Sequence, residues 1–139
     1  MKKIILLLCV SVFILTSCSS DDDNEDLSQD QLIGTWTYFQ SFEDGVEIIL
    51  TDCEKQETQE FSSNGDFTIT FYDDFDGPCE EDFVLSGTWS NSGNNLYTIE
   101  ALGQTISQEL VFEGDTYSVT ETDTDGGETI VYREVYIRN

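Results

Sequence analysis

The sequence predicts an all-β domain of about eight or nine antiparallel strands. Three observations support this. Helical periodicity is absent, β-branched and aromatic residues alternate with polar ones in short runs, and turn residues separate these runs. Connections this short join antiparallel neighbours, because a parallel crossover takes about a dozen residues or more. The pattern therefore predicts an antiparallel meander, either closed into a barrel or folded into two packed sheets.

The predicted strands begin near Gln31 and continue almost to the end of the chain. The clearest alternation of apolar residues is found in the segments 67–71, 83–89, 106–112, 117–119 and 130–136. The turn signals are Asp44-Gly45, Asn64-Gly65, Ser92-Gly93-Asn94, Gly114-Asp115 and Asp125-Gly126-Gly127. The length of the predicted β region, residues 31–139, suits a single domain with a small core.

The N-terminal segment has the features of an export signal. Lys2 and Lys3 precede an apolar run, 4–15, that is too short to span a bilayer. The run leads into Leu15-Thr16-Ser17-Cys18, which resembles the lipobox of bacterial lipoproteins. The resemblance implies cleavage before Cys18, acylation of its thiol and attachment to a membrane through the acyl chains. The alternative is an ordinary signal peptide with a chance cysteine.

Residues 18–30 are predicted to be a disordered acidic tether. Between Ser19 and Asp30 there are six acidic residues and one aliphatic residue, so the segment cannot bury enough apolar surface to fold. The sequence 19–23, Ser-Ser-Asp-Asp-Asp, resembles the export signal of certain Gram-negative surface lipoproteins. This resemblance implies an outer-membrane protein exposed at the cell surface. The predicted organisation is a signal peptide (1–17), a lipidated tether (18–30) and a β domain (31–139).

The charge of the chain restricts its partners. The sequence has 29 acidic residues and a net charge of −24. Loss of the signal leaves only Lys55, Arg133 and Arg138 as cations. Such a field repels nucleic acid, so we expect no nucleic-acid partner, and it favours a soluble monomer. The chain has no histidine, which excludes His-dependent catalytic triads and the commonest transition-metal ligand. We therefore expect no enzymatic activity.

Two cysteines remain in the predicted β domain. Cys53 and Cys79 form an even pair in an exported, oxidising compartment, which favours a disulfide. A loop of about 25 residues closed in this way is typically worth roughly 3 kcal/mol. A zinc site is the alternative, although two cysteines without histidine supply too few ligands.

The region from about Leu32 to Arg138 resembles the small lipocalin-like domain of many bacterial lipoproteins. The resemblance rests on the opening Gly34-Thr35-Trp36, on Cys53, on the turn 61–65 and on a second Gly-x-Trp at 87–89. It implies a small up-and-down β-barrel of about eight strands. Larger lipocalins usually carry a helix near the C-terminus, whereas here a strand is predicted to run nearly to the end.

A barrel of this kind suggests a small hydrophobic ligand. Apolar walls with a few polar contacts would hold such a molecule. Glu121 and Glu134 alternate in phase with the inward-facing aromatics, so they are either polar anchors or exposed at a strand end. The alternative function is a non-catalytic surface interaction protein with a filled barrel, binding a protein or glycan through acidic loops. The candidate ligand-binding residues are Trp36, Tyr38, Trp89, Tyr117 and Tyr132.

The densest acidic segment, 73–82, is the best candidate for a metal site. Calcium binds several oxygen ligands at once, and the candidate ligands are Asp73, Asp74, Asp76 and Glu80. The spacing does not match an EF-hand, because Tyr72 and Phe83 would occupy its first and last positions. The alternative is a solvated loop that binds no metal.

Overall fold

The computed structural model describes residues 27–75, 77–125 and 127–139, without the side chains of Ser28 and Asp125. The predicted signal peptide, Cys18, most of the predicted tether and Asp76 lie outside the described residues.

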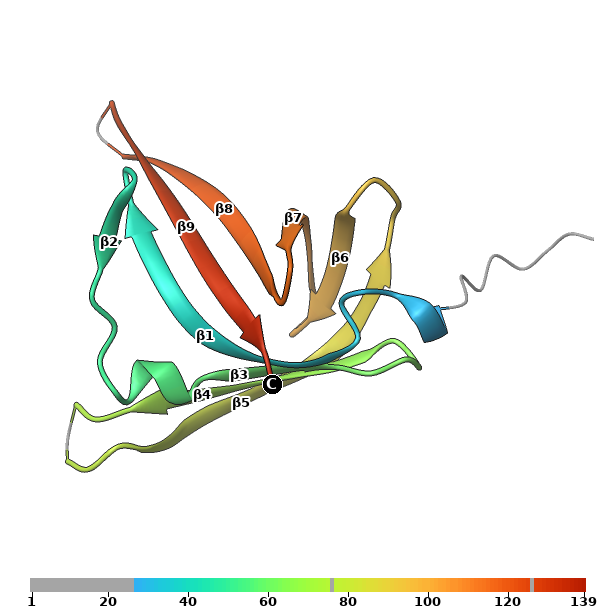
Figure 1. Ribbon diagram of the computed structural model, residues 1–139, viewed down its shortest axis with the longest axis horizontal. Helices are drawn as coiled ribbons and strands as arrows, with labels where there is room; N and C mark the ends of the chain where they lie inside the picture. The colour runs from blue at the N-terminus through green and yellow to red at the C-terminus, as the bar shows by residue number, and fades with distance from the viewer. Residues whose placement is uncertain (1–26, 76, 126) are drawn as a thin grey trace, which may run out of the picture.

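The described chain forms one antiparallel β-barrel (Figure 1). Eight strands are bonded in a ring, β1-β3-β4-β5-β6-β7-β8-β9, and the pairing of β1 with β9 closes it. The short strand β2 lies outside the ring and pairs with the second half of β1. Closure of the ring confirms the barrel and rules out two separate packed sheets. The strands are β1 (Gly34–Glu43), β2 (Val46–Ile48), β3 (Thr58–Phe61), β4 (Asp66–Asp73), β5 (Glu80–Asn91), β6 (Leu96–Ala101), β7 (Gln104–Glu113), β8 (Thr116–Asp125) and β9 (Glu128–Arg138).

The predicted turns fall between the strands at the expected places. Asp44-Gly45 joins β1 to β2, and both residues have positive φ, as a tight hairpin turn requires. The acidic segment 73–82, predicted to be a loop, is partly strand, because β4 ends at Asp73 and β5 begins at Glu80. Besides strands, the described residues contain two short 3₁₀ helices, η1 (Leu27–Gln29) and η2 (Glu54–Gln56). None of the described helices is both long and apolar enough to cross a membrane.

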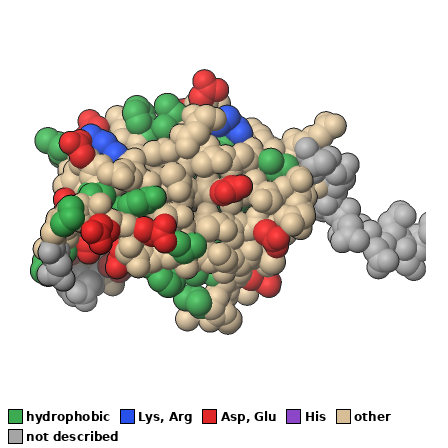
Figure 2. Space-filling model, turned by 90° about the horizontal axis from the view of Figure 1, so that it is seen from below, with side chains coloured by type: hydrophobic (Ala, Val, Ile, Leu, Met, Phe, Trp, Pro, Cys, Tyr) green, Lys and Arg blue, Asp and Glu red, His purple; other side chains and the backbone are tan. Residues whose placement is uncertain are grey.

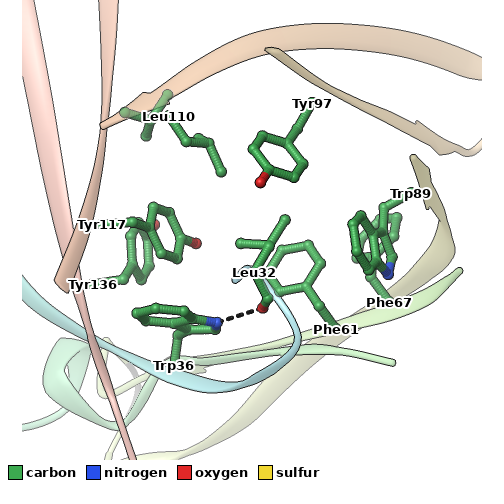
Figure 3. Close-up of a cluster of buried hydrophobic side chains, with 10 residues drawn as sticks. Leu32, Trp36, Phe61, Phe67, Trp89, Tyr97, Leu110, Tyr117 and Tyr136 are labelled. Atoms are coloured by element: carbon green, nitrogen blue, oxygen red, sulfur yellow. Dashed lines mark hydrogen bonds between the residues drawn. The ribbon is translucent and has the colours of Figure 1, made fainter. Parts of the chain in front are cut away.

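One end of the barrel is closed by the segment 27–33. Leu32 is fully buried inside the barrel, and its carbonyl accepts a hydrogen bond of 2.8 Å from the Trp36 indole (Figure 3). The Asp30 carboxylate accepts bonds from the Tyr97 hydroxyl at 3.0 Å and the Asn91 amide at 2.6 Å. Contacts with the barrel thus begin before residue 31, where composition places the start of the domain. Asp30 contributes through specific hydrogen bonds, which composition does not reveal.

The core lies at this closed end and is mostly aromatic. Trp36 and Tyr117 meet edge to face with ring centroids 4.8 Å apart, and Phe61 meets Trp89 in the same way at 5.9 Å. The guanidinium of Arg138 lies 4.1 Å from the centre of the Trp36 ring. Arg138 also donates to the carbonyls of the closing segment, which fixes that segment against the last strand.

Cys53 and Cys79 form the predicted disulfide. Their Cα atoms lie 5.5 Å apart, within the usual range for a bridge. The bond ties the start of η2 to the β4–β5 connection, and the Gln56 amide contacts the Cys79 sulfur at 3.3 Å. This cross-link holds η2 beside the barrel rim.

The second Gly-x-Trp has a steric reason for its glycine. Gly87 pairs directly with Phe67, so the two residues face the same side of the sheet. A Cβ at position 87 would lie 2.1 Å from the Glu100 carbonyl oxygen and 2.8 Å from a ring carbon of Phe67. The absence of a side chain therefore lets Phe67 and β6 approach β5 closely.

We expect Gly87→Ala to lower the free energy of unfolding by about 1–3 kcal/mol, because the added methyl overpacks the core against a backbone carbonyl. Urea unfolding followed by tryptophan fluorescence measures this. The matched control is Gly77→Ala, because a Cβ there meets nothing within 4 Å. It is expected to change stability by no more than about 0.5 kcal/mol. Equal losses in the two variants would contradict the steric explanation.

Candidate functional site

A cavity of about 120 Å³ lies inside the barrel, next to the buried aromatic core. Its lining is partly apolar and partly polar, with carboxylate, amide and phenol groups among the polar part. The apolar lining consists of Leu32, Phe61, Ile69, Ile99, Leu110 and Val119. The polar lining consists of Gln59, Gln108, Glu121 and Glu134 with Tyr97, Tyr117 and Tyr136.

Strand alternation and register bring the polar groups to the interior. On β8, Tyr117 and Glu121 project to the same side, as do Glu134 and Tyr136 on β9. The register pairs Tyr117 with Tyr136. Strand β1 has a bulge just after Tyr38, so that Tyr38 pairs with Tyr136, whereas Ser41 pairs with Glu134. Ser41 is buried, because this shift of one residue turns it toward the interior.

Three tyrosines stack along one wall of the barrel. The Tyr136 ring lies between Tyr38 and Tyr117, with centroid distances of 5.2 Å and 5.1 Å. The Tyr117 hydroxyl donates to Gln59 Oε1 at 2.5 Å, and Figure 3 shows this hydroxyl pointing into the barrel. Burial raises the pKa of both Tyr117 and Tyr136, so their hydroxyls stay protonated at neutral pH. Both phenols therefore act as fixed hydrogen-bond donors.

Two carboxylates converge on the hydroxyl of Tyr136. Glu134 Oε2 lies 2.9 Å from it, and Glu57 Oε1 lies 3.3 Å from it. Burial raises the pKa of the Glu57 carboxyl, and the charges of Glu134 and Glu54 raise it further, against hydrogen bonds from Gln59 and Tyr136 that lower it. The interior thus holds like charges close together in a partly desolvated space.

The five predicted ligand-binding residues do not form one cluster. Tyr117 lines the cavity, and the Tyr38 hydroxyl lies 3.5 Å from Glu134 Oε1. Trp36 and Trp89 belong to the closed-end core, where their indoles donate to the carbonyls of Leu32 and Ser62. Tyr132 is half-buried on β9 and pairs with Glu121.

Three polar residues of the interior were missed by sequence reasoning. Gln59 and Gln108 line the cavity, and Glu57 contacts Tyr136. Gln108 also donates a hydrogen bond to Glu121. The sequence did contain a signal for the two positions around the start of β3, because 57 and 59 alternate in phase with Phe61, which is buried. Glu121 and Glu134, for which the sequence left burial or exposure open, both line the cavity, but Glu134 is half-buried and Glu121 is exposed.

The acidic β4–β5 connection contains no recognisable metal centre in the part that the structure describes. Asp73 is the last residue of β4, and its carboxylate accepts a hydrogen bond of 2.7 Å from the Phe75 amide. Across the described ranges, no three acidic or cysteine side chains are grouped so that they could hold a metal ion. Asp76, one of the predicted calcium ligands, lies outside those ranges.

The outer surface carries a second, more open hollow of about 600 Å³ beside β1 and β2. Phe39, Ile48 and Ile49 contribute apolar side chains to it, and Ile49 is 91 % exposed. Elsewhere the surface is acidic: Figure 2 shows carboxylates spread over the face seen from below, where Lys and Arg are few. The interior cavity is the better candidate site, because polar and apolar groups from several strands converge there.

Comparison with known protein families agrees with this architecture. A family model described as a lipocalin-like domain matches residues 32–135. The chain therefore belongs to the lipocalin-like domain family. A comparison with curated proteins gave no match. Domains of this fold are typically binding modules.

The carboxyl of Glu57 is expected to make stability depend on pH. Because its pKa is raised above the usual 4.5, the folded protein binds this proton more tightly than the unfolded chain does. The resulting stabilisation is fully present below about pH 4.5 and is lost as the pH rises through the raised pKa. Glu57→Gln keeps this position neutral, so we expect it to be more stable than wild type at neutral pH and equal to it near pH 4.

Urea unfolding across this pH range measures the difference between the two proteins. The matched control is Glu60→Gln, which removes the same charge from an exposed position three residues farther along, on β3. A gain in stability of the same size for Glu60→Gln would show that general charge repulsion, and not burial of Glu57, is responsible.

Proposed function

We propose that this protein is a lipid-anchored lipoprotein of the cell envelope whose barrel binds a small hydrophobic molecule. The observation that carries the proposal is the interior cavity, where apolar side chains of six residues meet a few oriented polar groups. A small ligand site has this character: apolar walls supply affinity, and polar groups fix orientation. The protein acts by binding and not by catalysis, and it works as a monomer without nucleic acid.

The proposed location rests on the N-terminal sequence. The apolar run followed by Leu15-Thr16-Ser17-Cys18 supports lipidation of Cys18, and the acidic residues directly after it support export to the cell surface. The acyl chains on Cys18 would hold the domain at the outer membrane, and the acidic surface would keep it soluble.

Native mass spectrometry of the full chain in mild detergent tests ligand binding after exposure to a bacterial lipid extract. We expect a discrete added mass on the wild type. Val119→Phe fills a cavity wall and should abolish the added mass, with the fold checked by circular dichroism. Val111→Phe is the matched control, because Val111 is exposed on the outer face of β7 and should leave the added mass unchanged.

A bare protein mass for the wild type would contradict ligand binding in the barrel. That result would favour the alternative function, in which the acidic loops bind a protein or a glycan. An identical added mass on Val119→Phe would place the bound molecule elsewhere on the protein.

Lipid anchoring has a direct test in cells. We expect Cys18→Ser to move the protein from the membrane fraction to the soluble fraction and to abolish incorporation of labelled palmitate. Cys9→Ser is the matched control, since Cys9 lies in the predicted signal peptide and should not affect either result. Continued palmitate labelling of Cys18→Ser would contradict the proposed lipidation site.

A further inference from the structure

On the proposed function, in which the barrel binds a small molecule, the charges around the cavity restrict the chemistry of that ligand. Glu121 and Glu134 line the cavity, and Glu57 reaches the same Tyr136 hydroxyl as Glu134. Among the described residues that line the cavity there is no Lys or Arg. The cavity therefore presents the half-buried carboxylate of Glu134 and the exposed carboxylate of Glu121 without a cation beside them.

Each Lys and Arg side chain in the described chain lies away from the cavity. Arg138 lies over Trp36 and donates to the carbonyls of Ile33 and Gln31 at the closed end. Arg133 lies with its guanidinium 4.2 Å from the Phe42 ring centre, on the outward-facing side of β9. Lys55 is exposed in η2 and lines the outer hollow. The described cations thus leave the cavity carboxylates unneutralised.

The two carboxylates that meet at Tyr136 have only neutral donors. Glu134 accepts from the hydroxyls of Tyr136 and Tyr38. Glu57 accepts from Tyr136 and Gln59. One phenol proton lies between two acceptors, at 2.9 Å from Glu134 and 3.3 Å from Glu57, and it can complete only one strong bond at a time. A partly buried carboxylate that lacks a full set of donors favours a proton or a cationic partner. A ligand that brings positive charge and N–H donors would supply both requirements.

The apolar part of the cavity lining selects the rest of the ligand. Leu32, Phe61, Leu110 and Val119 are buried and provide this apolar surface, and Val119 is the cross-strand neighbour of Glu134. The volume of about 120 Å³ corresponds to roughly four water molecules, which suits a short hydrocarbon group. Charge and shape together describe a small amphipathic molecule with an apolar body and a cationic head.

We propose that the barrel binds a small organic amine in its ammonium form, with Glu134 as the principal anchor, Glu57 and Glu121 beside it, and the apolar body against Leu32 and Leu110. An anionic ligand such as a short fatty acid is excluded from this cavity, because its carboxylate would meet the interior carboxylates.

Proton and ammonium compete for the same carboxylates. Glu57 faces Tyr38 from β1, Gln59 from β3, Tyr117 from β8, Glu134 and Tyr136 from β9, and Glu54 from η2. None of these groups is cationic, so a proton on Glu57 reduces the negative charge beside Glu134. Amine affinity should therefore rise as the pH increases through the raised pKa of Glu57.

Isothermal titration calorimetry of the full chain in mild detergent tests the proposal with three probes of equal length: hexylammonium, hexanol and hexanoate. We expect hexylammonium to bind at least tenfold more tightly than hexanol, and hexanoate not to bind. Glu134→Gln should weaken hexylammonium at least tenfold and leave hexanol within twofold. Glu109→Gln, which removes an exposed charge from β7, is the matched control and should leave all three affinities unchanged.

The outcomes separate this proposal from the general one. Equal binding of hexanol and hexylammonium would overturn the ammonium assignment and leave a ligand-binding barrel in place. Failure of all three probes to bind would also overturn the ammonium assignment. The added mass in native mass spectra tests independently whether the barrel binds a small molecule at all. Should Glu134→Gln fail to fold, the ranking of the three probes on the wild type and its pH dependence still decide the question.

Discussion

The pairing of β1 with β9 is the contact on which the rest of the structure depends. It converts a meander into a closed ring and places the two ends of the domain side by side. Arg138 can therefore lie over Trp36 and hold the closing segment, while Tyr136 and Glu134 lie opposite Tyr38 and Ser41. Core, closed end and polar interior all arise from this one pairing.

The interior departs from the usual arrangement of a small barrel filled by apolar side chains. Carboxylates and amides occupy positions at which Ile or Leu would pack more favourably, and partial desolvation of Glu57 is unfavourable. The tyrosine wall offsets part of this cost, because its stacked rings are buried and its hydroxyls donate to the interior acceptors. Residues that lower stability in this way are typical of a site used for recognition.

Alternation and turn residues predicted most of the barrel, because both depend on neighbours along the chain. The two Gly-x-Trp sequences mark the closed end, where Gly87 permits the approach of Phe67. The cavity was harder to predict, because its walls come from six strands and the closing segment, and its volume depends on how their side chains meet. Trp36 and Trp89 pack into the core beside Leu32, whose burial depends on a segment outside the strands. The bulge after Tyr38 changes the phase of β1, so the burial of Ser41 does not follow from a regular pattern. Glu57, in contrast, continues the alternation of Gln59 and Phe61 beyond the start of β3.

The closing segment has a consequence for the orientation of the protein at a membrane. The described chain starts at this end of the barrel (Figure 1). Glu121 and Glu134 lie away from the ends of β8 and β9 at Thr116 and Arg138, which are next to the closing segment. With acyl chains on Cys18, the intervening residues would keep the closed end within about 30 Å of the bilayer. The other end of the barrel could then face away from the bilayer. Under the proposed anchoring at the cell surface, molecules would be exchanged with water and not taken laterally from the lipid.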